Sequence, residues 1–362
     1  MDRRKFLHSL TALGAGSALP ALAMNETRAP VLAAGTQSTV SDNSGDLHTP
    51  ESGGDWEAPR IGIVAIGGAG SAILSSLSGN FPYLSRSIAV DTDPFALHRI
   101  RANQKILVGN GQKLHAIAMG RLSSATNRQI GQAVDGLDVV FILAGMGGNA
   151  GTVISPLVAD ITGDAGLLTI AAAMMPFDFE GDRCQRIAQA GRRELCRRVN
   201  AFVPLLPNEQ FFRAVGNGVL FESALDQVSG SFGQLYRGIA TLLGEPGLVG
   251  IDPEDIRGML SHVDGYAAVG YGCSSGHTAS EMAILNAIKS PLLGEVRLRR
   301  ASGILLSIEG KPALLKMRGI SKIVHFTRDL APDVSLIFGG KPNSMLADDF
   351  CVTLLASGIR TV

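Results

Sequence analysis

The sequence predicts an α/β fold built on a mostly parallel sheet. Two nearly continuous apolar runs, at residues 61–66 and 138–143, have the pattern of strands buried on both faces. Each run leads into a glycine-rich turn and then into a stretch expected to be helical. The composition agrees, because 44 glycines and only 5% aromatic residues suit many tight turns between strands and helices.

Composition also limits the function. The chain has 362 residues, of which 46% are hydrophobic, enough for two domains with sizeable cores. Lys+Arg and Asp+Glu both number 32, so nothing indicates a nucleic-acid-binding protein, which usually carries a basic excess. The 4 cysteines form no CxxC pair and no metal-binding spacing with histidine. They predict ordinary thiols, with no disulfide framework and no metal site.

The N-terminus predicts an export signal. Arg3 and Arg4 form a twin-arginine pair, a mildly apolar stretch runs to Met24, and Ala21–Ala23 offers small residues for cleavage. Residues 1–24 therefore resemble a bacterial twin-arginine signal, which implies a periplasmic protein. Two alternatives stay open. In the first, the arginines are there by chance. In the second, the segment is an uncleaved anchor that holds a cytoplasmic protein to the membrane, although its apolar stretch is shorter than the about 20 apolar residues of a spanning helix.

The fold is expected to begin after a linker. Residues 25–58 are rich in Ser, Thr, Gly, Asp, Asn and Pro and predict a flexible segment. The strand at 61–66 then leads into a turn made by Gly67, Gly68 and Gly70, with a helix from Ser71 onward. Glycines there let the backbone approach a phosphate, and the helix N-terminus offers free N–H groups.

A second strand, Ser87–Val90, ends in Asp91 and Asp93. An acidic residue about 20 positions after a glycine turn is also part of the dinucleotide-binding signature, in which it holds a ribose hydroxyl. The full G-x-G-x-x-G pattern is missing here. A dehydrogenase therefore remains an alternative at this point.

The second glycine loop distinguishes these functions. After the strand at 138–143, the loop spans residues 145–153, and a helix is expected from about Ile154. The next strand, "LLTIAAAMMP", runs into "PFDFEG" at Pro176–Gly181. Two glycine loops on adjacent strand ends, with an acidic loop after the following strand, would surround one nucleotide. A typical dinucleotide-binding dehydrogenase lacks this arrangement.

These motifs resemble the FtsZ branch of the tubulin/FtsZ superfamily. The resemblance covers roughly residues 59–360, and several separate motifs occur in the family's order. The first two are "AGMGGNAGTV" at 144–153 for the phosphate loop and "PFDFEG" at 176–181 for the ribose loop. They are followed by residues 246–272 for the loop that completes the neighbour's site with the strand after it, residues 287–310 for the start of the second domain, and residues 350–359 for the last strand.

The resemblance implies a domain order and a way of assembling. It implies a nucleotide-binding domain at 59–228, a central helix within 229–247, built from Ser229–Gly244, and a C-terminal α/β domain at 248–362. Family members bind GTP, with Mg²⁺ accompanying the nucleotide, and their subunits stack head to tail. The chain is therefore expected to self-associate into filaments, or to modulate those of another FtsZ-like protein. The sequence stops at Val362, just after the last strand, so no C-terminal tether peptide is expected.

The resemblance also assigns site residues. Asp252 and Asp255 would act as catalytic residues on the nucleotide of the neighbouring subunit. The nucleotide-binding residues would be Gly67, Gly68, Gly70, Ser71, Gly147, Gly148, Gly151, Thr152, Glu180 and Arg183.

Several positions depart from the family pattern. Ala72, Ala150 and Cys184 replace residues that contact the nucleotide, and the position that reads guanine falls near Gly230. Asn149 and Val153 replace glycines, and Asn149 raises the question of a positive φ. The stretch at 110–124 is shorter than the family's loop under the γ-phosphate.

About four lost hydrogen-bond partners would weaken binding by about 4 kcal/mol, on the order of a thousandfold, and base specificity would fall first. The alternative function is a non-hydrolysing scaffold that keeps the fold and has lost GTP turnover.

Overall fold

The computed structural model describes residues 58–77, 81–109, 122–205, 221–244, 253–260, 266–290, 293 and 298–359. The predicted signal, nearly all of the predicted linker, most of the short stretch at 110–124 and Asp252 lie outside these residues. What was predicted for those segments stays a prediction. In the described part of the chain, no helix is both long enough and apolar enough to cross a membrane.

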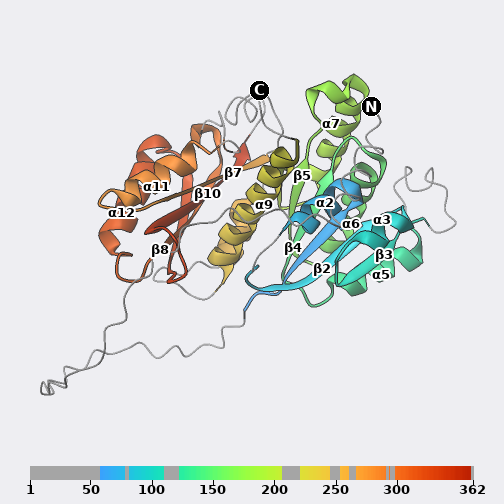
Figure 1. Ribbon diagram of the computed structural model, residues 1–362, viewed down its shortest axis with the longest axis horizontal. Coiled ribbons are helices and arrows are strands. Elements are labelled where there is room, and N and C mark those ends of the chain that lie inside the picture. Colours follow the sequence, from blue (N-terminus) through green and yellow to red (C-terminus); the bar gives the residue numbers. More distant parts are fainter. Residues whose placement is uncertain are drawn as a thin grey trace, which may run out of the picture. The chain divides into compact units, whose positions relative to one another are not determined.

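The first sheet has six strands, all parallel, in the order β3-β2-β1-β4-β5-β6 (Figure 1). This order places β1 and β4 side by side, at the point where the chain reverses its direction across the sheet. In open α/β sheets, ligands bind at the carboxyl ends of the strands at such a point. The strands are β1 (Ile61–Ile66), β2 (Leu84–Asp91), β3 (Gln104–Leu107), β4 (Val139–Gly145), β5 (Leu168–Met174) and β6 (Ala201–Leu205).

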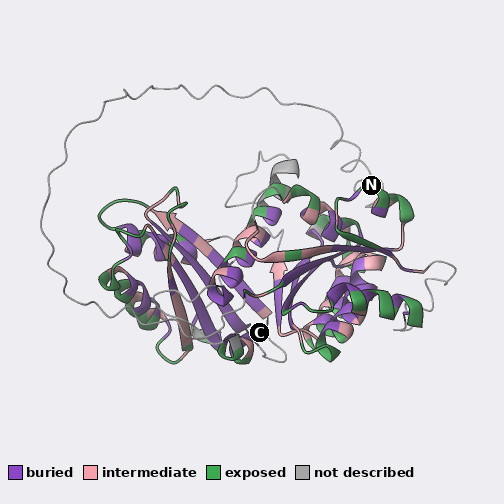
Figure 2. Ribbon diagram, turned by 90° about the horizontal axis from the view of Figure 1, so that it is seen from below, coloured by how far each residue is buried: buried purple, intermediate pink, exposed green. Residues whose placement is uncertain are grey.

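Helices cover both faces of this sheet, which explains why the central strands β1 and β4 are apolar and buried along their whole length. Ile61, Ile63 and Ala65 pack on one face with α9, whereas Val64 and Ile66 pack on the other. Figure 2 shows the central strands buried between exposed helical surfaces. The flanking helices are α2 (Gly67–Ser76), α3 (Pro94–Arg99), α5 (Ser124–Val134), α6 (Asn149–Asp164) and α7 (Asp182–Cys196), with a short 3-10 helix at Asp178–Glu180.

The central helix α9 (Phe221–Leu243) begins eight residues before the predicted start at Ser229. Serine and glycine usually mark helix ends, but tertiary contacts keep Ser229 inside this one. Its buried hydroxyl lies 2.7 Å from the Ser76 hydroxyl at the end of α2. Further along, Tyr236 packs against Phe141 of β4 and donates a hydrogen bond to the Pro82 carbonyl oxygen at 2.8 Å.

The second sheet has four strands in the order β7-β10-β8-β9. β10 runs antiparallel to both of its neighbours, and β9 runs parallel to β8. The strands are β7 (Tyr266–Ser274), β8 (Gly303–Gly310), β9 (Ser335–Pro342) and β10 (Phe350–Ile359), accompanied by helices α10 (Pro253–Leu260), α11 (Ala279–Ile288) and α12 (Met317–Leu330) and a 3-10 helix at Leu298–Arg300. Together the two sheets confirm the predicted fold class.

The prediction of ordinary thiols is wrong for two of the four cysteines. Cys273 of β7 and Cys351 of β10 lie directly opposite each other in the antiparallel register, and they form a disulfide with a Cα–Cα distance of 4.1 Å. Their separation of 78 residues gives no sign of the pairing. Only the adjacency of the two strands brings them together. Cys184 and Cys196 remain as thiols.

Candidate functional site

Two helix N-termini lie side by side at the carboxyl edge of the first sheet. β1 leads directly into α2, and the neighbouring β4 leads through a short turn into α6. A Cβ atom added to Gly67 would lie 3.1 Å from the Ala150 Cβ and 3.2 Å from the Gly151 nitrogen, so the first turns of the two helices are in contact. Neither helix has a side-chain cap or an acidic residue in its first turn.

Helix α2 begins at Gly67, four residues before the predicted start at Ser71, so all four residues predicted there as a turn and helix start lie in its first two turns. Gly67 itself has the left-handed φ of 69°, which connects the strand to the helix. Gly70 has a packing role, because a Cβ there would lie 2.2 Å from the Leu143 carbonyl oxygen. Gly68 is exposed and is therefore the residue through which this turn meets solvent.

Ser71 stands out in the same helix. Its side chain is buried, with 4% relative exposure, and its hydroxyl has no hydrogen-bond partner among the described residues. A buried hydroxyl without a partner costs about 1–3 kcal/mol, so native proteins rarely keep one without a reason. Ser71 follows the first turn of α2, whose Gly67 contacts α6, so this hydroxyl is a candidate for holding a ligand there.

The predicted glycine loop is mostly helix. α6 begins at Asn149, five residues before the predicted Ile154, and Gly148 is its N-cap. The positive φ in this segment belongs to Gly147, at 89°, whereas Asn149 is helical, so the concern about its Cβ was wrong. Gly148 and Asn149 lie at or close to the surface, which leaves the start of α6 accessible.

Two of the predicted loop residues serve the loop itself. The Thr152 hydroxyl is nearly buried and accepts a hydrogen bond from the Gly147 N–H at 2.9 Å. Gly151 lets α6 approach β4, because a Cβ there would lie 2.3 Å from the Gly145 carbonyl oxygen. Both residues therefore shape the loop, and the backbone N–H groups of Gly148 and Asn149 are better placed to meet an anion.

The segment after β5 lies at the same edge of the sheet, because β5 pairs in parallel with β4. The Glu180 carboxylate accepts a hydrogen bond from the Phe177 N–H at 2.9 Å, which closes the turn on itself. Phe179 is 76% exposed and stacks on the buried Phe177 with 5.0 Å between ring centroids. Arg183 is exposed in the first turn of α7. Glu180 at the end of the 3-10 helix and Arg183 at the start of α7 therefore both belong to the segment that follows β5.

Asp91, on which the dehydrogenase alternative rested, is occupied within its own turn. It lies at the end of β2 with 5% exposure and accepts hydrogen bonds from the Thr92 N–H at 2.6 Å and the Asp93 N–H at 3.2 Å. Burial raises the pKa of Asp91 above its ordinary value. A side chain held this way serves the turn between β2 and α3, and it gives the dehydrogenase alternative no support.

The predicted catalytic aspartates belong to the segment before the second sheet. Asp252 lies outside the described residues. Asp255 is exposed in the first turn of α10, beside the exposed Glu254. Ile256, Met259 and Leu260 of this helix are buried in the core that also contains β1. The packing of α10 therefore directs its acidic first turn toward solvent.

This arrangement can hold a polyanion. Each helix N-terminus carries about half a positive charge, and its first N–H groups lack partners within the helix. Two such ends in contact, free of side-chain caps, are suited to adjacent phosphate groups. Sequence reasoning found the glycines and Ser71, but it could not show that the Ser71 hydroxyl lacks a partner.

Comparisons with known families agree with this geometry. The model of the tubulin/FtsZ family GTPase domain matches residues 60–216, and that of the FtsZ family C-terminal domain matches residues 265–360. The cell division protein FtsZ of Buchnera aphidicola is 32% identical over 306 residues, covering 83% of this chain and 79% of that protein. The FtsZ of Pseudomonas aeruginosa is 30% identical over 306 residues, with 83% and 77% covered.

Solved structures show the same likeness. An empty FtsZ dimer from M. jannaschii superposes with a TM-score of 0.70 at 26% identity, covering 84% of this chain and 89% of that one. CetZ2 from Haloferax volcanii, solved as a GTPγS-bound protofilament, gives a TM-score of 0.67 at 19% identity, covering 83% and 93%. At that lower identity the likeness concerns the fold alone.

Proposed function

Because the chain belongs to the tubulin/FtsZ family, we propose that it binds GTP at the paired N-termini of α2 and α6 and self-associates head to tail. The observation that carries the first part is the contact between two uncapped helix ends, with the buried Ser71 hydroxyl lacking a partner in one of them. The N–H groups of both turns would hold the phosphates, together with any accompanying Mg²⁺. Glu180 would contact the ribose, and Arg183 would lie nearby.

The structure bears on how much GTP affinity the substitutions at family positions are expected to remove. Asn149 is helical and unstrained, so it removes no affinity through its backbone. Gly230 is exposed on α9 and has no side chain with which to read a base. The phosphate contacts therefore come mainly from backbone groups that no substitution removes. We expect binding that depends on the phosphates and discriminates weakly between guanine and adenine.

A calorimetric titration with GTP, ATP and NAD tests nucleotide binding. We expect saturable GTP binding that weakens about tenfold in Ser71→Ala, because the variant loses one hydrogen bond of about 1–1.5 kcal/mol. Ser75→Ala is the matched control, since Ser75 is exposed one turn further along α2 and, among the described residues, donates to the Ser71 carbonyl oxygen alone. Absence of binding by every nucleotide at millimolar concentration would support the scaffold alternative. Preferential NAD binding would support the dehydrogenase.

The variant Asp255→Asn tests head-to-tail self-association and GTP hydrolysis together. In a head-to-tail assembly, carboxylates of one subunit would orient and polarise the water that attacks the neighbour's γ-phosphate. Such a heterologous contact extends into open filaments. We expect Asp255→Asn to bind GTP normally and to hydrolyse it about a hundredfold more slowly.

Phosphate release measured against protein concentration checks this, because wild-type turnover per subunit should rise as subunits assemble. The matched control is Glu254→Gln, since Glu254 pairs with Arg257 on its own helix at 3.6 Å. Wild-type hydrolysis by Asp255→Asn, or turnover that does not change with concentration, contradicts the shared site. Wild-type assembly without hydrolysis points to the scaffold alternative.

We further propose that the protein is exported to the periplasm. The twin-arginine pair Arg3–Arg4 motivates this, and the disulfide between Cys273 and Cys351 supports it, because structural disulfides persist mainly in oxidising compartments. N-terminal sequencing of protein from the native cell should find a start near Met24. An intact Met1 on cytoplasmic or membrane-bound protein would instead support the anchor alternative.

A further inference from the structure

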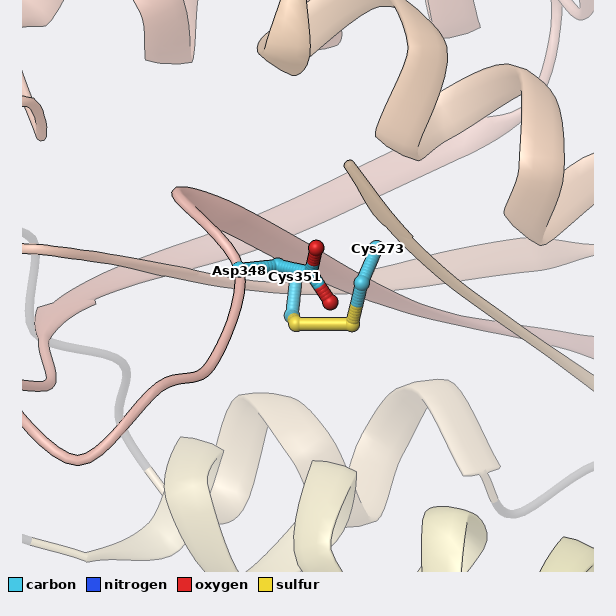
Figure 3. Close-up of side chains that lie close together, drawn as sticks. All are labelled: Cys273, Asp348 and Cys351. Carbon is cyan, nitrogen blue, oxygen red and sulfur yellow. A yellow bond between two sulfur atoms is a disulfide. The ribbon is translucent and has the colours of Figure 1, made fainter. Parts of the chain in front are cut away.

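A cluster of two cysteines and a carboxylate lies on the second sheet, away from the candidate nucleotide site. The two sulfurs of Cys273 and Cys351 and a carboxylate oxygen of Asp348 all lie within 4.8 Å of one another (Figure 3). Cys351 is buried, whereas Cys273 and Asp348 are half-buried, so the cluster is open to solvent on the Asp348 side. The nucleotide site uses none of these residues.

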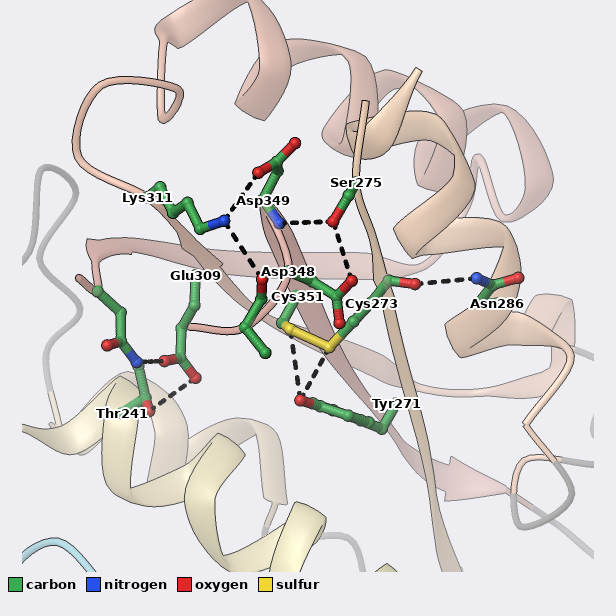
Figure 4. Close-up of a disulfide and its surroundings, with 12 residues drawn as sticks. Thr241, Tyr271, Cys273, Ser275, Asn286, Glu309, Lys311, Asp348, Asp349 and Cys351 are labelled. Carbon is green, nitrogen blue, oxygen red and sulfur yellow. Dashed lines mark hydrogen bonds and ion pairs between the residues drawn. A yellow bond between two sulfur atoms is a disulfide. The ribbon is translucent and has the colours of Figure 1, made fainter. Parts of the chain in front are cut away.

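The carboxylate is oriented toward the sulfurs by a neighbour. Asp348 accepts a hydrogen bond from the Ser275 hydroxyl at 2.9 Å, which leaves its second oxygen to face the cysteines (Figure 4). Among the described side chains, none forms an ion pair with Asp348. The adjacent Asp349 differs, since it pairs with Lys311 at 3.1 Å and accepts from the Gly276 N–H at 2.8 Å. One acid is thus neutralised, and the other remains available beside the cysteines.

A tyrosine completes the surroundings. The Tyr271 hydroxyl lies 2.9 Å from the Cys273 sulfur and 3.4 Å from the Cys351 sulfur (Figure 4). It can donate a hydrogen bond to a thiolate at either position. Groups of this kind around a metal site fix the orientation of the ligands and tune their basicity.

We propose that these residues form a zinc site that exists only when the disulfide is reduced. Two cysteine thiolates and one carboxylate are ligands that zinc accepts, and water would take the fourth position of the tetrahedron. Magnesium and calcium prefer oxygen ligands alone, so the two sulfurs select against them. The cluster would carry three negative charges with both thiols ionised, which a divalent cation largely compensates.

The disulfide and the metal exclude each other. Tetrahedral zinc with Zn–S bonds of about 2.3 Å holds its two sulfurs about 3.8 Å apart, which a covalent S–S bond does not allow. A dithiol reductant converts the disulfide to two thiols and becomes a disulfide itself, transferring two electrons and two protons. Zinc then displaces one proton from each thiol. A disulfide oxidant reverses the sequence by thiol–disulfide exchange, and the zinc is released.

Zinc titration of the metal-free full-length chain against a chromophoric chelator tests the proposal. The Cys184→Ser/Cys196→Ser background leaves only the paired cysteines. We expect one zinc ion per reduced chain and none per oxidised chain. Asp348→Asn should weaken zinc binding at least about tenfold while still forming the disulfide, whereas Asp349→Asn, the matched carboxylate control, should bind as the background does.

Cobalt substitution supplies a readout that depends on the ligands themselves. Reduced protein loaded with Co²⁺ should show a thiolate-to-metal charge-transfer band and tetrahedral d–d absorption, and both should be absent in Cys273→Ser/Cys351→Ser. Zinc should also protect Cys273 and Cys351 from alkylation in a mass-spectrometric assay. Equal zinc binding by oxidised and reduced chains, unchanged affinity in Asp348→Asn, or no cobalt–thiolate band overturns the proposal. These results are independent of GTP binding.

Discussion

Reducing the Cys273–Cys351 disulfide is expected to lower the free energy of unfolding of the metal-free chain by about 4 kcal/mol. The bond closes a loop with a sequence separation of 78 residues, and a loop of that length restricts the unfolded chain strongly. This segment contains α11, β8, α12 and β9, so reduction removes the constraint on most of the second sheet. Urea unfolding followed by far-UV circular dichroism, with and without reductant, measures the difference.

The other two cysteines make this experiment specific. Cys184→Ser/Cys196→Ser should lose the same stability on reduction as the wild type, because neither residue belongs to the disulfide. Cys273→Ser/Cys351→Ser should not respond to reductant at all. A change of less than about 0.5 kcal/mol in the wild type would show that strand pairing alone restrains the unfolded chain. If the zinc site exists, added zinc should restore part of the lost stability by binding only the folded reduced chain.

Much of the first domain could be predicted from sequence because its signals are local. The apolar runs of β1 and β4 indicate strands buried on both faces, and glycine-rich turns after each strand indicate the ligand edge. The residues at which helices begin are harder to predict from local sequence. Ser229 was expected to begin α9, yet its contact with Ser76 keeps it within the helix. Such contacts override the weak local preference of a serine.

Long-range pairing was beyond sequence reasoning. The strands that became β7 and β10 were both recognised, but nothing in either stretch says that Cys273 faces Cys351. The same limit applies to the orphaned hydroxyl of Ser71, which depends on what surrounds α2 in the folded chain. In both cases the residue type indicates which reactions or hydrogen bonds are possible. Which of them occurs depends on the residues that pack around it in the folded chain.

A substitution at the start of α6 is expected to affect both the stability of the fold and GTP binding at the candidate site. Replacing Gly151 with alanine is expected to destabilise the chain by about 3 kcal/mol, because the new Cβ would lie 2.3 Å from the Gly145 carbonyl oxygen and 3.0 Å from its nitrogen. These are backbone atoms of β4 and cannot rotate away. Helix α6 would have to shift from the strand, and the hydrogen bond from the Gly147 N–H to Thr152 would shift with it. We therefore expect weaker GTP binding as well as a lower urea midpoint.

A second glycine in the same helix provides the matched control. Gly163 is exposed near the end of α6, and a Cβ added there would meet nothing within 4 Å. Gly163→Ala should therefore stabilise the chain by about 0.5 kcal/mol, through the better helix propensity of alanine, and leave GTP binding unchanged. The two variants make the same chemical change in one helix with opposite expected signs. If Gly151→Ala were as stable as the wild type, α6 would not depend on close contact with β4, and the loop before it would be shaped by something other than this glycine.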